Sequence, residues 1–517
     1  MDMKPATAVQ RRLIVEIEQE VKKRKARNRK NYNQYFTPEF VVEKALSLVP
    51  KLDVKNLIDP VVGEGIFLRV ASKFFRDADM FGMDIDDSVI WRLKKNPLPN
   101  ARYFTTDALS DEMWKIGEVK EVLAEGGYDL VVGNPPFSSW FERVESARLL
   151  SGYELAYRNN KLMKSQSVEA LFLERFIKLA KNGGYIVIVL PDGILSNPQY
   201  KYARKFLLEK TKVRHILSLP RGVFEETSAK TSILVLERRG GGELNYKSRL
   251  SSLEKTGDVN NTILVEASDL IERMDWQYYR NLKRNRVNEL IKRGVKFVPL
   301  KEFVVYCKTG KTLYGKERKF ADKGLRFLHA TNITEVGINY KKDEKFIDPL
   351  GKMNFLSAHT KVGDMVFVRV GVGCAGRVAI IDSKDDEGIA SDYIHILRVK
   401  EINPYFLVLY LKTKYGRDSI NLLKHGVGTV SINKTDLMSI PIPVVPTAFQ
   451  EDVEEKFKAI LNEYKTAGDN RKVLTKIKFL VFSVEKKIMN FNKEVANAQK
   501  RSSQGEAIRR PGGLGRD

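Results

Sequence analysis

Between residues 33 and 240 the hydrophobic positions follow two alternating patterns. Short continuous apolar runs, rich in Val and Ile, are separated by stretches with the spacing of amphipathic helices. The continuous runs predict strands that are buried on both faces, and the stretches between them predict the covering helices. This alternation predicts an α/β domain with a doubly wound sheet. The clearest strand candidates are NLIDP, MFGMDID, YDLVVGNPP and GGYIVIVLP.

One helix of this domain is expected in the run SVEALFLERFIKLAKNGG. Its apolar residues fall on one side at helical spacing. Gly183 and Gly184 close the run, and glycine is the residue most often found just past a helix end. We therefore expect the helix to stop at this glycine pair.

The pattern changes twice further along the chain. A Gly-rich break over 240–242 marks the expected end of the α/β domain, and β-rich runs such as GDMVFVRVG and DYIHILRV begin after about residue 296. Long helical patterns follow from about residue 447. The expected organisation is a basic N-terminal arm over 1–32, the α/β domain over 33–240, a charged connector over 241–295, an α+β domain over 296–465, a helical segment over 466–498 and a disordered tail over 499–517.

The charge of the chain adds a candidate partner. Lys and Arg number 89 against 65 Asp and Glu, which gives a net charge of +24 over 517 residues. Such an excess favours a polyanion, and nucleic acid over a membrane surface, although a Lys-rich proteome is an alternative explanation. Two cysteines and five scattered histidines make a metal site unexpected. Because no apolar run approaches about 18 residues, we expect a cytoplasmic protein without a membrane segment.

Three acidic residues follow predicted strands: Asp59, Asp84 and Asp107. Ligands of doubly wound sheets bind at the carboxyl ends of the strands, so these side chains are candidate ligand contacts. Gly63 and Gly65 allow close approach of the backbone, Asp84 is suited to a ribose diol, and Asp107 to an adenine amine. The turn lacks the longer glycine motif that binds pyrophosphate. The expected cofactor is therefore a nucleoside without phosphates, S-adenosylmethionine.

The tetrapeptide NPPF, Asn134 to Phe137, ends another predicted strand. The side-chain oxygen of Asn134 and the carbonyl of Pro135 could hold both hydrogens of an exocyclic adenine amine, whose lone pair would then face an activated methyl group. Pro135 and Pro136 would fix that carbonyl, and Phe137 would stack on an extruded base. Direct displacement of this kind needs no metal. The alternative is an ordinary strand-end turn that contains two prolines.

In their order along the chain, these motifs resemble the γ-order N6-adenine DNA methyltransferases over residues 33 to about 240. The resemblance implies a Rossmann-like methyltransferase fold, with NPPF as the catalytic motif and Asn134 also at the cofactor. In the segment GVFEETSAKTSILVLE, it implies that Phe224 contacts the flipped base. The cofactor contacts that it implies are Tyr35, Thr37 and Pro38 in NQYFTPEFV, Asp59, Pro60, Gly63 and Gly65 in DPVVGEGIF, Asp84 and Ile85, Asp107, and Phe172 in EALFLERF.

A second resemblance covers roughly residues 296 to 465. GLRFLHATNIT, KVGDMVFVRVGVGCAGRVAII and the run that begins GTVSINKTDLMSIPIPVVP resemble one target-recognition domain of type I specificity subunits. This implies that the chain reads its own sequence in double-stranded DNA. We expect Lys308, Lys311 and Lys316 to face DNA phosphate. The sequence leaves open whether a separate restriction nuclease or specificity subunit is a partner. It also leaves open whether the protein is a monomer or a dimer through the C-terminal helices.

The expected function is sequence-specific methylation of adenine N6 in DNA, within a restriction–modification system. Two alternatives remain. NPP-containing enzymes also methylate protein glutamine or RNA bases, but they do not need a specificity-like domain. A catalytically inactive DNA-binding subunit would have no need for intact Asn134, Phe137 and Asp84.

Overall fold

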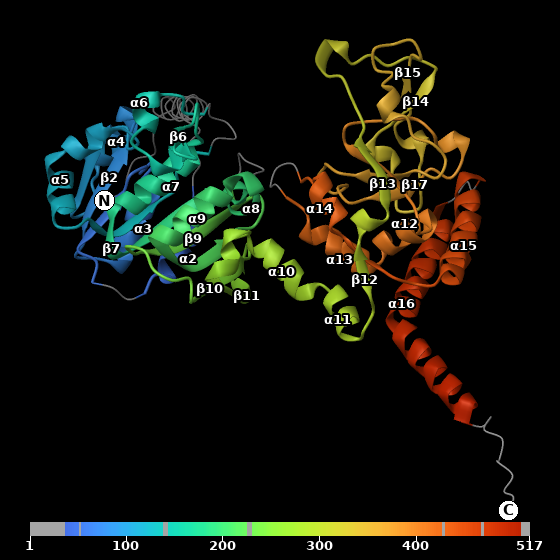
Figure 1. Ribbon diagram of the computed structural model, residues 1–517. Helices are drawn as coiled ribbons and strands as arrows, with labels where there is room; N and C mark the ends of the chain where they lie inside the picture. The colour runs from blue at the N-terminus through green and yellow to red at the C-terminus, as the bar shows by residue number, and fades with distance from the viewer. Residues whose placement is uncertain are drawn as a thin grey trace, which may run out of the picture. The chain divides into compact units, whose positions relative to one another are not determined.

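The computed structural model describes residues 37–50, 53–137, 143–224, 230–425, 430–466 and 470–507. The chain separates into two compact units, Met1–Arg280 and Asn281–Asp517 (Figure 1). The basic arm expected over 1–32, and Tyr35, lie outside the described residues. Within those residues, none of the helices has the length and apolarity needed to cross a lipid bilayer.

The first unit is built on a nine-stranded sheet with the strand order β11-β10-β8-β9-β7-β4-β1-β2-β3. Its strands are β1 (Asn56–Asp59), β2 (Asp79–Asp84), β3 (Ala101–Thr105), β4 (Tyr128–Gly133), β7 (Ala180–Pro191), β8 (Thr211–Ser218), β9 (Thr231–Arg238), β10 (Lys247–Leu253) and β11 (Val259–Glu266). Strands β7, β4, β1, β2 and β3 pair in parallel, whereas β9 is antiparallel to both its neighbours. The order reverses between β1 and β4, which is the switch point of the sheet.

Helices cover both faces of this sheet (Figure 1). Alternate strand residues explain this, because Ile58 and Val131 join one core cluster while Leu57 and Val132 join the other. The expectation of a doubly wound α/β sheet is confirmed. The first cluster includes residues of α5 (Gly117–Ala124), α7 (Val168–Leu179) and α9 (Lys201–Lys210), and the second includes residues of α2 (Glu39–Ser47), α3 (Ile66–Phe74) and α4 (Asp87–Lys95). Shorter elements are α6 (Ala147–Leu150), α8 (Asp192–Ser196) and the hairpin β5 (Tyr157–Arg158) and β6 (Lys161–Leu162), and α10 (Trp276–Arg284) runs across the unit boundary.

The helix expected to stop at Gly183 and Gly184 ends earlier. Helix α7 ends at Leu179, and β7 begins at the next residue and includes both glycines. A Cβ atom on Gly184 would lie 2.8 Å from the carbonyl oxygen of Tyr128 on β4. The glycine is therefore needed where β7 approaches β4 closely, and not as a helix cap.

The prediction of a charged connector over 241–295 is wrong. Strands β10 and β11 lie within it and extend the sheet, with β10 parallel to β8 and β11 at the edge. Leu250 and Leu253 of β10 are buried, while most residues of the edge strand β11 are exposed or half-buried. Charged and polar residues on an exposed edge strand hid the strand pattern.

The second unit contains three small sheets and a group of helices. A four-stranded antiparallel sheet has the order β13-β19-β16-β17, and β15-β14-β18 and β12-β20 form the other two. The strands are β12 (Phe297–Pro299), β13 (Val304–Thr309), β14 (Leu325–Leu328), β15 (Phe346–Ile347), β16 (Met365–Val368), β17 (Val378–Ile380), β18 (Ile389–Ala390), β19 (Ile394–Val399) and β20 (Pro441–Pro443). This mixture of sheet and helix confirms the expected α+β class.

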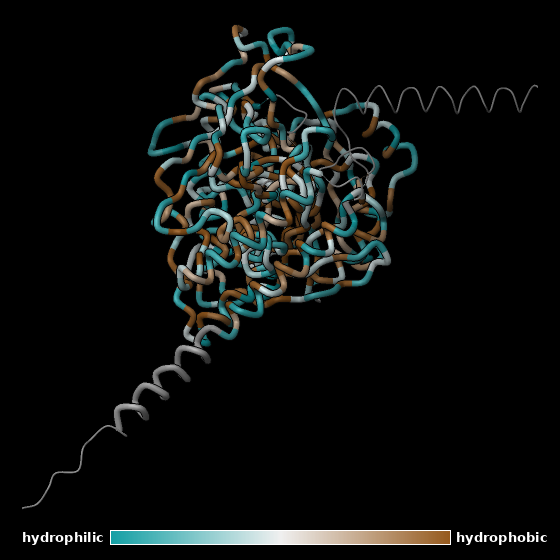
Figure 2. Tube along the Cα trace, turned by 90° about the vertical axis from the view of Figure 1, so that its right-hand side faces the viewer, coloured by the Kyte–Doolittle hydropathy of each residue, from teal (hydrophilic) through white to brown (hydrophobic). Residues whose placement is uncertain are grey.

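The helices of the second unit pack around one buried helix. They are α11 (Val287–Lys292), α12 (Pro404–Lys412), α13 (Lys414–Leu422), α14 (Lys434–Met438), α15 (Thr447–Thr466) and α16 (Asn470–Ala507). Every residue of α12 from Tyr405 onward is buried, and α15 and α16 add Phe457, Val473 and Ile477 to the same core. Hydrophobic segments concentrate toward the inside of the folded parts (Figure 2). Because α16 extends to Ala507, the tail expected from 499 onward begins within this helix.

Candidate active site

The switch point between β1 and β4 brings the first predicted residues together. Asp59 is the last residue of β1, and Asn134 directly follows β4. A Cβ atom on Gly133 would lie only 2.7 Å from Asp59 Oδ1, so the two strand ends are in close contact. Gly133 also has φ +153°, which an L side chain adopts only with strain. A glycine is therefore required between the buried strand and the Asn134 amide.

Asp59 is a buried carboxyl group with 1% of its surface exposed. The backbone N–H of Val61 donates to its Oδ1 over 3.0 Å. Burial raises the pKa of Asp59 well above its ordinary value, and the charge of nearby Asp84 raises it further, against the lowering effect of the Val61 hydrogen bond. Asp59 thus shapes the turn after β1 by accepting a backbone hydrogen bond.

Asp84 ties the glycine turn to the end of β2. Its Oδ2 accepts from the backbone N–H of Gly63 over 3.0 Å, and its Oδ1 accepts from that of Asp86 over 2.9 Å. Burial is the largest effect on its pKa and raises it. The Gly63 backbone has φ +52° and Gly65 φ +76°, so both expected turn glycines use conformations that favour glycine.

Ile85, the next residue, is 56% exposed although it is a large hydrophobic side chain. It lies at the strand end beside Asp84, where an apolar surface is open to a ligand ring. Pro60 is buried between Asp59 and the glycine turn, and Thr37 and Pro38 lie just before α2, in buried and half-buried positions. Together these residues could surround a nucleoside.

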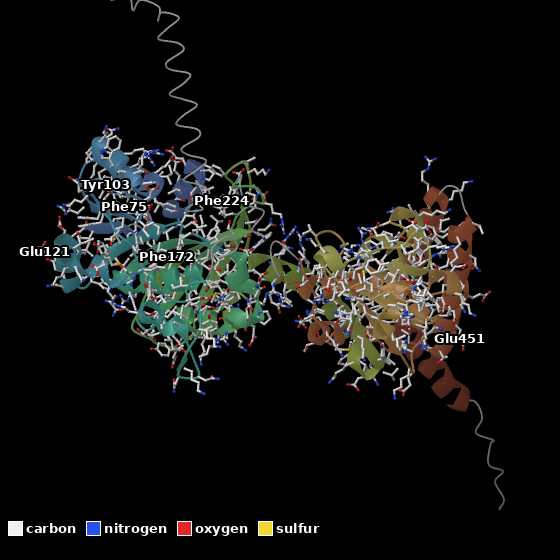
Figure 3. All side chains as sticks on the ribbon, turned by 90° about the horizontal axis from the view of Figure 1, so that it is seen from above. Phe75, Tyr103, Glu121, Phe172, Phe224 and Glu451 are labelled. Carbon is white, nitrogen blue, oxygen red and sulfur yellow. The ribbon has the colours of Figure 1, made fainter. Side chains whose placement is uncertain are left out.

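Asp107 and Phe172 are not joined to this group by a hydrogen bond within the described residues. Asp107 is half-buried in the turn after β3, where its Oδ1 accepts from the N–H of Leu109 over 2.9 Å. Phe172 lies on α7 with 5% of its surface exposed, in the core cluster on the other face of the sheet from Phe224. Figure 3 marks Phe172 and Phe224 on separate elements of the first unit.

The side-chain amide of Asn134 is hydrogen-bonded through its nitrogen but not through its oxygen within the described residues. Its Nδ2 donates to the hydroxyl oxygen of Thr37 over 3.1 Å. Its Oδ1 is buried and has no hydrogen-bond partner among the described residues. A buried acceptor without a partner is unfavourable by about 1–3 kcal/mol, so this oxygen is prepared to receive a donor.

The two aromatic residues expected at a flipped base are buried. Phe137 is 1% exposed and Phe224 is 3% exposed, and both belong to the core cluster that includes Val41, Phe67 and Val132. In this conformation neither ring presents a face to solvent. Stacking on a base therefore requires a change of rotamer or of backbone at these two positions.

The end of β7 carries a further acid that the sequence pattern alone did not single out. Asp192 follows Pro191, is 3% exposed, and accepts from the Ser232 hydroxyl over 2.6 Å. Burial raises its pKa, and Lys230, whose Nζ lies 3.6 Å away, lowers it. Its position directly after the predicted strand GGYIVIVLP could have identified Asp192 as a candidate from the sequence. In the structure this strand, β7, pairs in parallel with β4. The same strand-end argument that selected Asp59 and Asp84 applies to Asp192.

The three lysines expected at DNA phosphate lie in the second unit, within or just after β13. Lys308, Lys311 and Lys316 are all exposed. The Lys308 Nζ lies 5.9 Å from the ring centre of Tyr306, and the Lys311 Nζ lies 5.5 Å from that of Phe355. They present positive charge on the surface of this unit.

Comparison with known proteins matches two family models to the two parts of the chain. Residues 18–312 match the N-6 DNA Methylase model, and residues 292–475 match the Type I restriction modification DNA specificity domain model. The combination of a methylase-like and a specificity-like segment, expected from the motifs, is confirmed.

Individual relatives are distant, and each matches only part of its own length. The Type I restriction enzyme MpnII methylase subunit of Mycoplasma pneumoniae is 23% identical over 222 residues, which cover 40% of this chain and 41% of that protein. The EcoEI methylase subunit of Escherichia coli is 28% identical over 218 residues, covering 40% and 42%. Type II methyltransferase M.AccI of Acinetobacter calcoaceticus is 21% identical over 298 residues, covering 54% and 51%. The chain spans about half of these relatives' length or less.

Among solved structures, the Type IIL restriction-modification enzyme MmeI in complex with DNA aligns with a TM-score of 0.53 at 12% identity, over 90% of this chain and 75% of that one. At this identity the similarity concerns the fold alone. The methylase model carries the assignment, because it matches more than half of the 517 residues and includes the strand-end group of Asp59, Asp84 and Asn134. The chain belongs to the N-6 DNA methylase family.

Proposed function

We propose that this chain is a sequence-specific DNA methyltransferase that transfers a methyl group from S-adenosylmethionine to the exocyclic N6 of adenine, within a restriction–modification system. The observation that carries the proposal is the buried Oδ1 of Asn134 at the switch point of the sheet, which has no hydrogen-bond partner within the described part of the chain. An amine with two hydrogens is the donor that this acceptor and a neighbouring carbonyl would bind. Family membership supports the same chemistry.

Asn134 and Pro135 would bind the target amine. One amine hydrogen would go to Asn134 Oδ1 and the other to the Pro135 carbonyl, which favours a pyramidal nitrogen with an available lone pair. Thr37 would keep the amide in the right orientation, since it occupies the Nδ2 end. Pro135 and Pro136 restrict the backbone, so little reorganisation is needed when the amine arrives. Phe137 and Phe224 would stack on the base after moving out of the core.

The described residues fit S-adenosylmethionine. When bound, it supplies a methyl group that is already activated by its positive sulfur. Asp84 would accept from the ribose diol with its remaining lone pairs, and Ile85 would pack on the adenine ring. Asp107 would accept from the adenine amine, and Thr37, Pro38 and Phe172 would complete the site. Asp59, Pro60, Gly63 and Gly65 would shape the turn that borders the cofactor.

The second unit would select the DNA sequence. Its match to a specificity-domain model and the net charge of +24 support double-stranded DNA as the partner. Lys308, Lys311 and Lys316 would contact phosphate. A separate restriction nuclease or specificity subunit would be a further partner in such a system, and α15 and α16 would provide a dimer contact if the active form is a dimer.

The test is methyl transfer by the purified full chain. Radiolabelled S-adenosylmethionine and genomic DNA that lacks modification are incubated together, and the DNA is hydrolysed to nucleosides. N6-methyladenine is expected in the wild type and should be absent in Asn134→Ala, whose cofactor dissociation constant should stay within a few-fold of the wild type. Asn96→Ala, an exposed position at the end of α4, is the matched control.

Three outcomes contradict the proposal. If the labelled product is N4-methylcytosine, the target base is cytosine and not adenine. If the label appears in protein or RNA and not in DNA, the substrate belongs to a different class. A wild type that binds the cofactor but labels none of these substrates would indicate an inactive DNA-binding subunit.

A further inference from the structure

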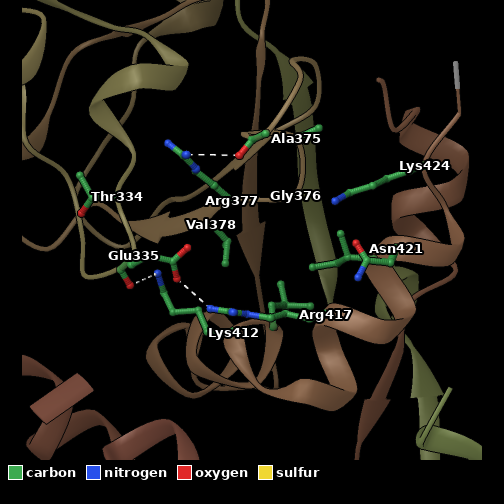
Figure 4. Close-up of a pocket in the computed structure, with 13 residues that line it drawn as sticks. Thr334, Glu335, Ala375, Gly376, Arg377, Val378, Lys412, Arg417, Asn421 and Lys424 are labelled. Carbon is green, nitrogen blue, oxygen red and sulfur yellow. Dashed lines mark hydrogen bonds and ion pairs between the residues drawn. The ribbon is translucent and has the colours of Figure 1, made fainter. Parts of the chain in front are cut away.

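A cavity of about 180 Å³ lies within the second unit. Its walls come from the loop between β16 and β17, from the end of α12, from α13, and from the segment around Thr334 (Figure 4). None of these segments belongs to the group of residues at the strand ends of the first unit. The cavity therefore needs an explanation of its own.

Positive side chains dominate the lining. Arg377 precedes β17, Lys412 ends α12, Arg417 lies on α13, and Lys424 follows α13. Of the described residues that line the cavity, Glu335 alone carries a carboxylate. The lining therefore carries four cations and one carboxylate, which suits it to a negatively charged ligand.

Lys412 is the buried cation of this group. It is 6% exposed, and its ammonium donates one hydrogen bond, over 2.8 Å, to the backbone carbonyl of Glu335. An ammonium has three N–H donors, so two have no partner among the described residues. Desolvation lowers the pKa of Lys412 to about 8, with opposing contributions from Glu335, which raises it, and Arg417, which lowers it. A bound anion would satisfy the donors and compensate the burial.

The carboxylate of Glu335 pairs with one of the four cations of the lining. Its Oε2 pairs with Arg417 Nη2 over 2.7 Å, and both side chains are more than half exposed, at 59% and 57%. Such an exposed pair is weak and exchanges readily with an incoming anion. Arg377 donates to the carbonyl oxygens of Gly373 and Ile333, over 3.2 and 3.4 Å.

The loop that carries Arg377 is fixed against α13. A Cβ atom on Gly376 would lie 2.5 Å from Ile420 Cγ2, and Gly376 has φ +94°. Lys424 points toward Gly376 (Figure 4). The loop that carries Arg377 is therefore packed closely against α13, which reduces the cost of organising this part of the lining around a ligand.

We propose that this cavity binds a phosphate group, and that the phosphate belongs to the backbone of DNA. The choice of DNA rests on the proposed function, whereas the choice of phosphate rests on the cavity itself. A phosphate has several acceptor oxygens and can accept from Lys412, Arg377 and Arg417 at once. Contacts of this kind fix the position of DNA and do not read its sequence.

The first experiment measures phosphate binding by the full chain. Inorganic phosphate is titrated calorimetrically, with sodium acetate as the carboxylate comparison and sodium chloride as the background. Phosphate should bind at least fivefold more tightly than acetate, and Arg377→Gln should raise the dissociation constant for phosphate at least fivefold. Lys412→Met is the direct test of the buried ammonium, and Arg377→Gln keeps the proposal testable if Lys412→Met does not fold. Lys456→Gln, an exposed lysine of α15 paired with Asp452, is the control.

The second experiment identifies the source of the phosphate. The dissociation constant for a non-specific duplex is measured over a range of salt concentrations. The logarithm of the binding constant falls linearly with the logarithm of the salt concentration. Arg377→Gln removes one phosphate-binding cation and should reduce the steepness of this line by about 0.9, whereas Lys456→Gln should leave it unchanged. Tight phosphate binding with an unchanged slope would overturn the DNA source and indicate a free phosphate compound. Acetate binding as tightly as phosphate, or no anion binding at all, would overturn the site. Neither readout depends on methyl transfer, so an inactive enzyme would contradict only the proposed function.

Discussion

The hydroxyl oxygen of Thr37 accepts a hydrogen bond of 3.1 Å from Nδ2 of Asn134, although the two residues are 97 positions apart. The bond determines which end of the amide is available. With Nδ2 held, Oδ1 is left as a buried acceptor without a described partner. A residue that the family resemblance assigns to the cofactor is thus also placed to orient the amide that would bind the target amine.

Thr37→Val should therefore reduce the turnover number more than it weakens cofactor binding. Valine has a similar shape but accepts no hydrogen bond, so the amide can rotate and its oxygen loses its orientation. A neutral hydrogen bond contributes about 1 kcal/mol, which corresponds to about a fivefold lower kcat. Steady-state kinetics and cofactor titration check this, and Thr37→Ser should recover most of the loss. A cofactor dissociation constant that rises as much as kcat falls would make Thr37 a cofactor contact instead.

Ile85→Ala should weaken cofactor binding without destabilising the fold. Its side chain is 56% exposed beside Asp84, so the substitution removes little packing within the protein. Removal of the apolar surface that would cover the adenine ring should raise the cofactor dissociation constant roughly fivefold, or about 1 kcal/mol. Ile291→Ala, at a position of similar exposure (51%) in α11, is the control. Equal effects of the two substitutions would remove Ile85 from the cofactor site.

The sequence predicted the sheet around the switch point because parallel buried strands have a simple signature. Continuous apolar runs followed by Asp59, Asp84 and Asn134 placed these residues at the same edge, and β4, β1 and β2 pair in that arrangement. Strands β10 and β11 were missed, since β11 is an exposed edge strand and β10 alternates charged, serine and leucine residues, so neither shows a continuous apolar run. The Thr37–Asn134 bond and the burial of Phe137 depend on tertiary packing, which periodicity does not contain.

Gly133→Ala should destabilise the first unit strongly. The added Cβ would meet Asp59 Oδ1 at 2.7 Å and Phe176 Cζ at 3.0 Å, at a φ of +153°. Overpacking and backbone strain of this kind cost about 2–4 kcal/mol. Gly117→Ala is the matched control, because its added Cβ meets no atom within 4 Å. Urea denaturation of both variants measures the difference, and a Gly133→Ala protein as stable as Gly117→Ala would show that the strand ends can move apart.

The first unit should lose stability in acid through His215. The pKa of His215 is lowered from 6.5 to about 4, mainly by burial and to a smaller extent by the positive charge of Arg249. Between these two values the unfolded chain binds a proton at His215 that the folded chain does not. The contribution of His215 to the free energy of unfolding therefore falls as the pH drops from 6.5 to 4 and is constant above 6.5. The loss from this residue is roughly 3 kcal/mol at pH 4.

His215→Gln isolates this contribution. Glutamine stays neutral and can still bond to the Ser251 hydroxyl, which lies 3.0 Å from His215 Nε2. All four tryptophans occur before residue 281, so their fluorescence follows unfolding of the first unit. Urea denaturation at pH 7 and pH 4.5 should show a smaller loss in the variant than in the wild type. Buried carboxyl groups such as Asp59 titrate in both proteins and cancel in the comparison.

Replacement of Lys308, Lys311 and Lys316 by glutamine should weaken DNA binding without changing the preferred sequence. All three side chains are exposed, and Lys308 and Lys311 lie over aromatic rings that restrict their positions. For each lysine that binds a phosphate, its replacement should reduce the slope of binding against salt by about 0.9, and affinity for specific and non-specific duplexes should fall together. Lys456, Lys458 and Lys472 on α15 and α16 provide a triple variant with the same change in charge. If that variant reduces the slope equally, the effect comes from net charge, and the loop after β13 does not bind DNA.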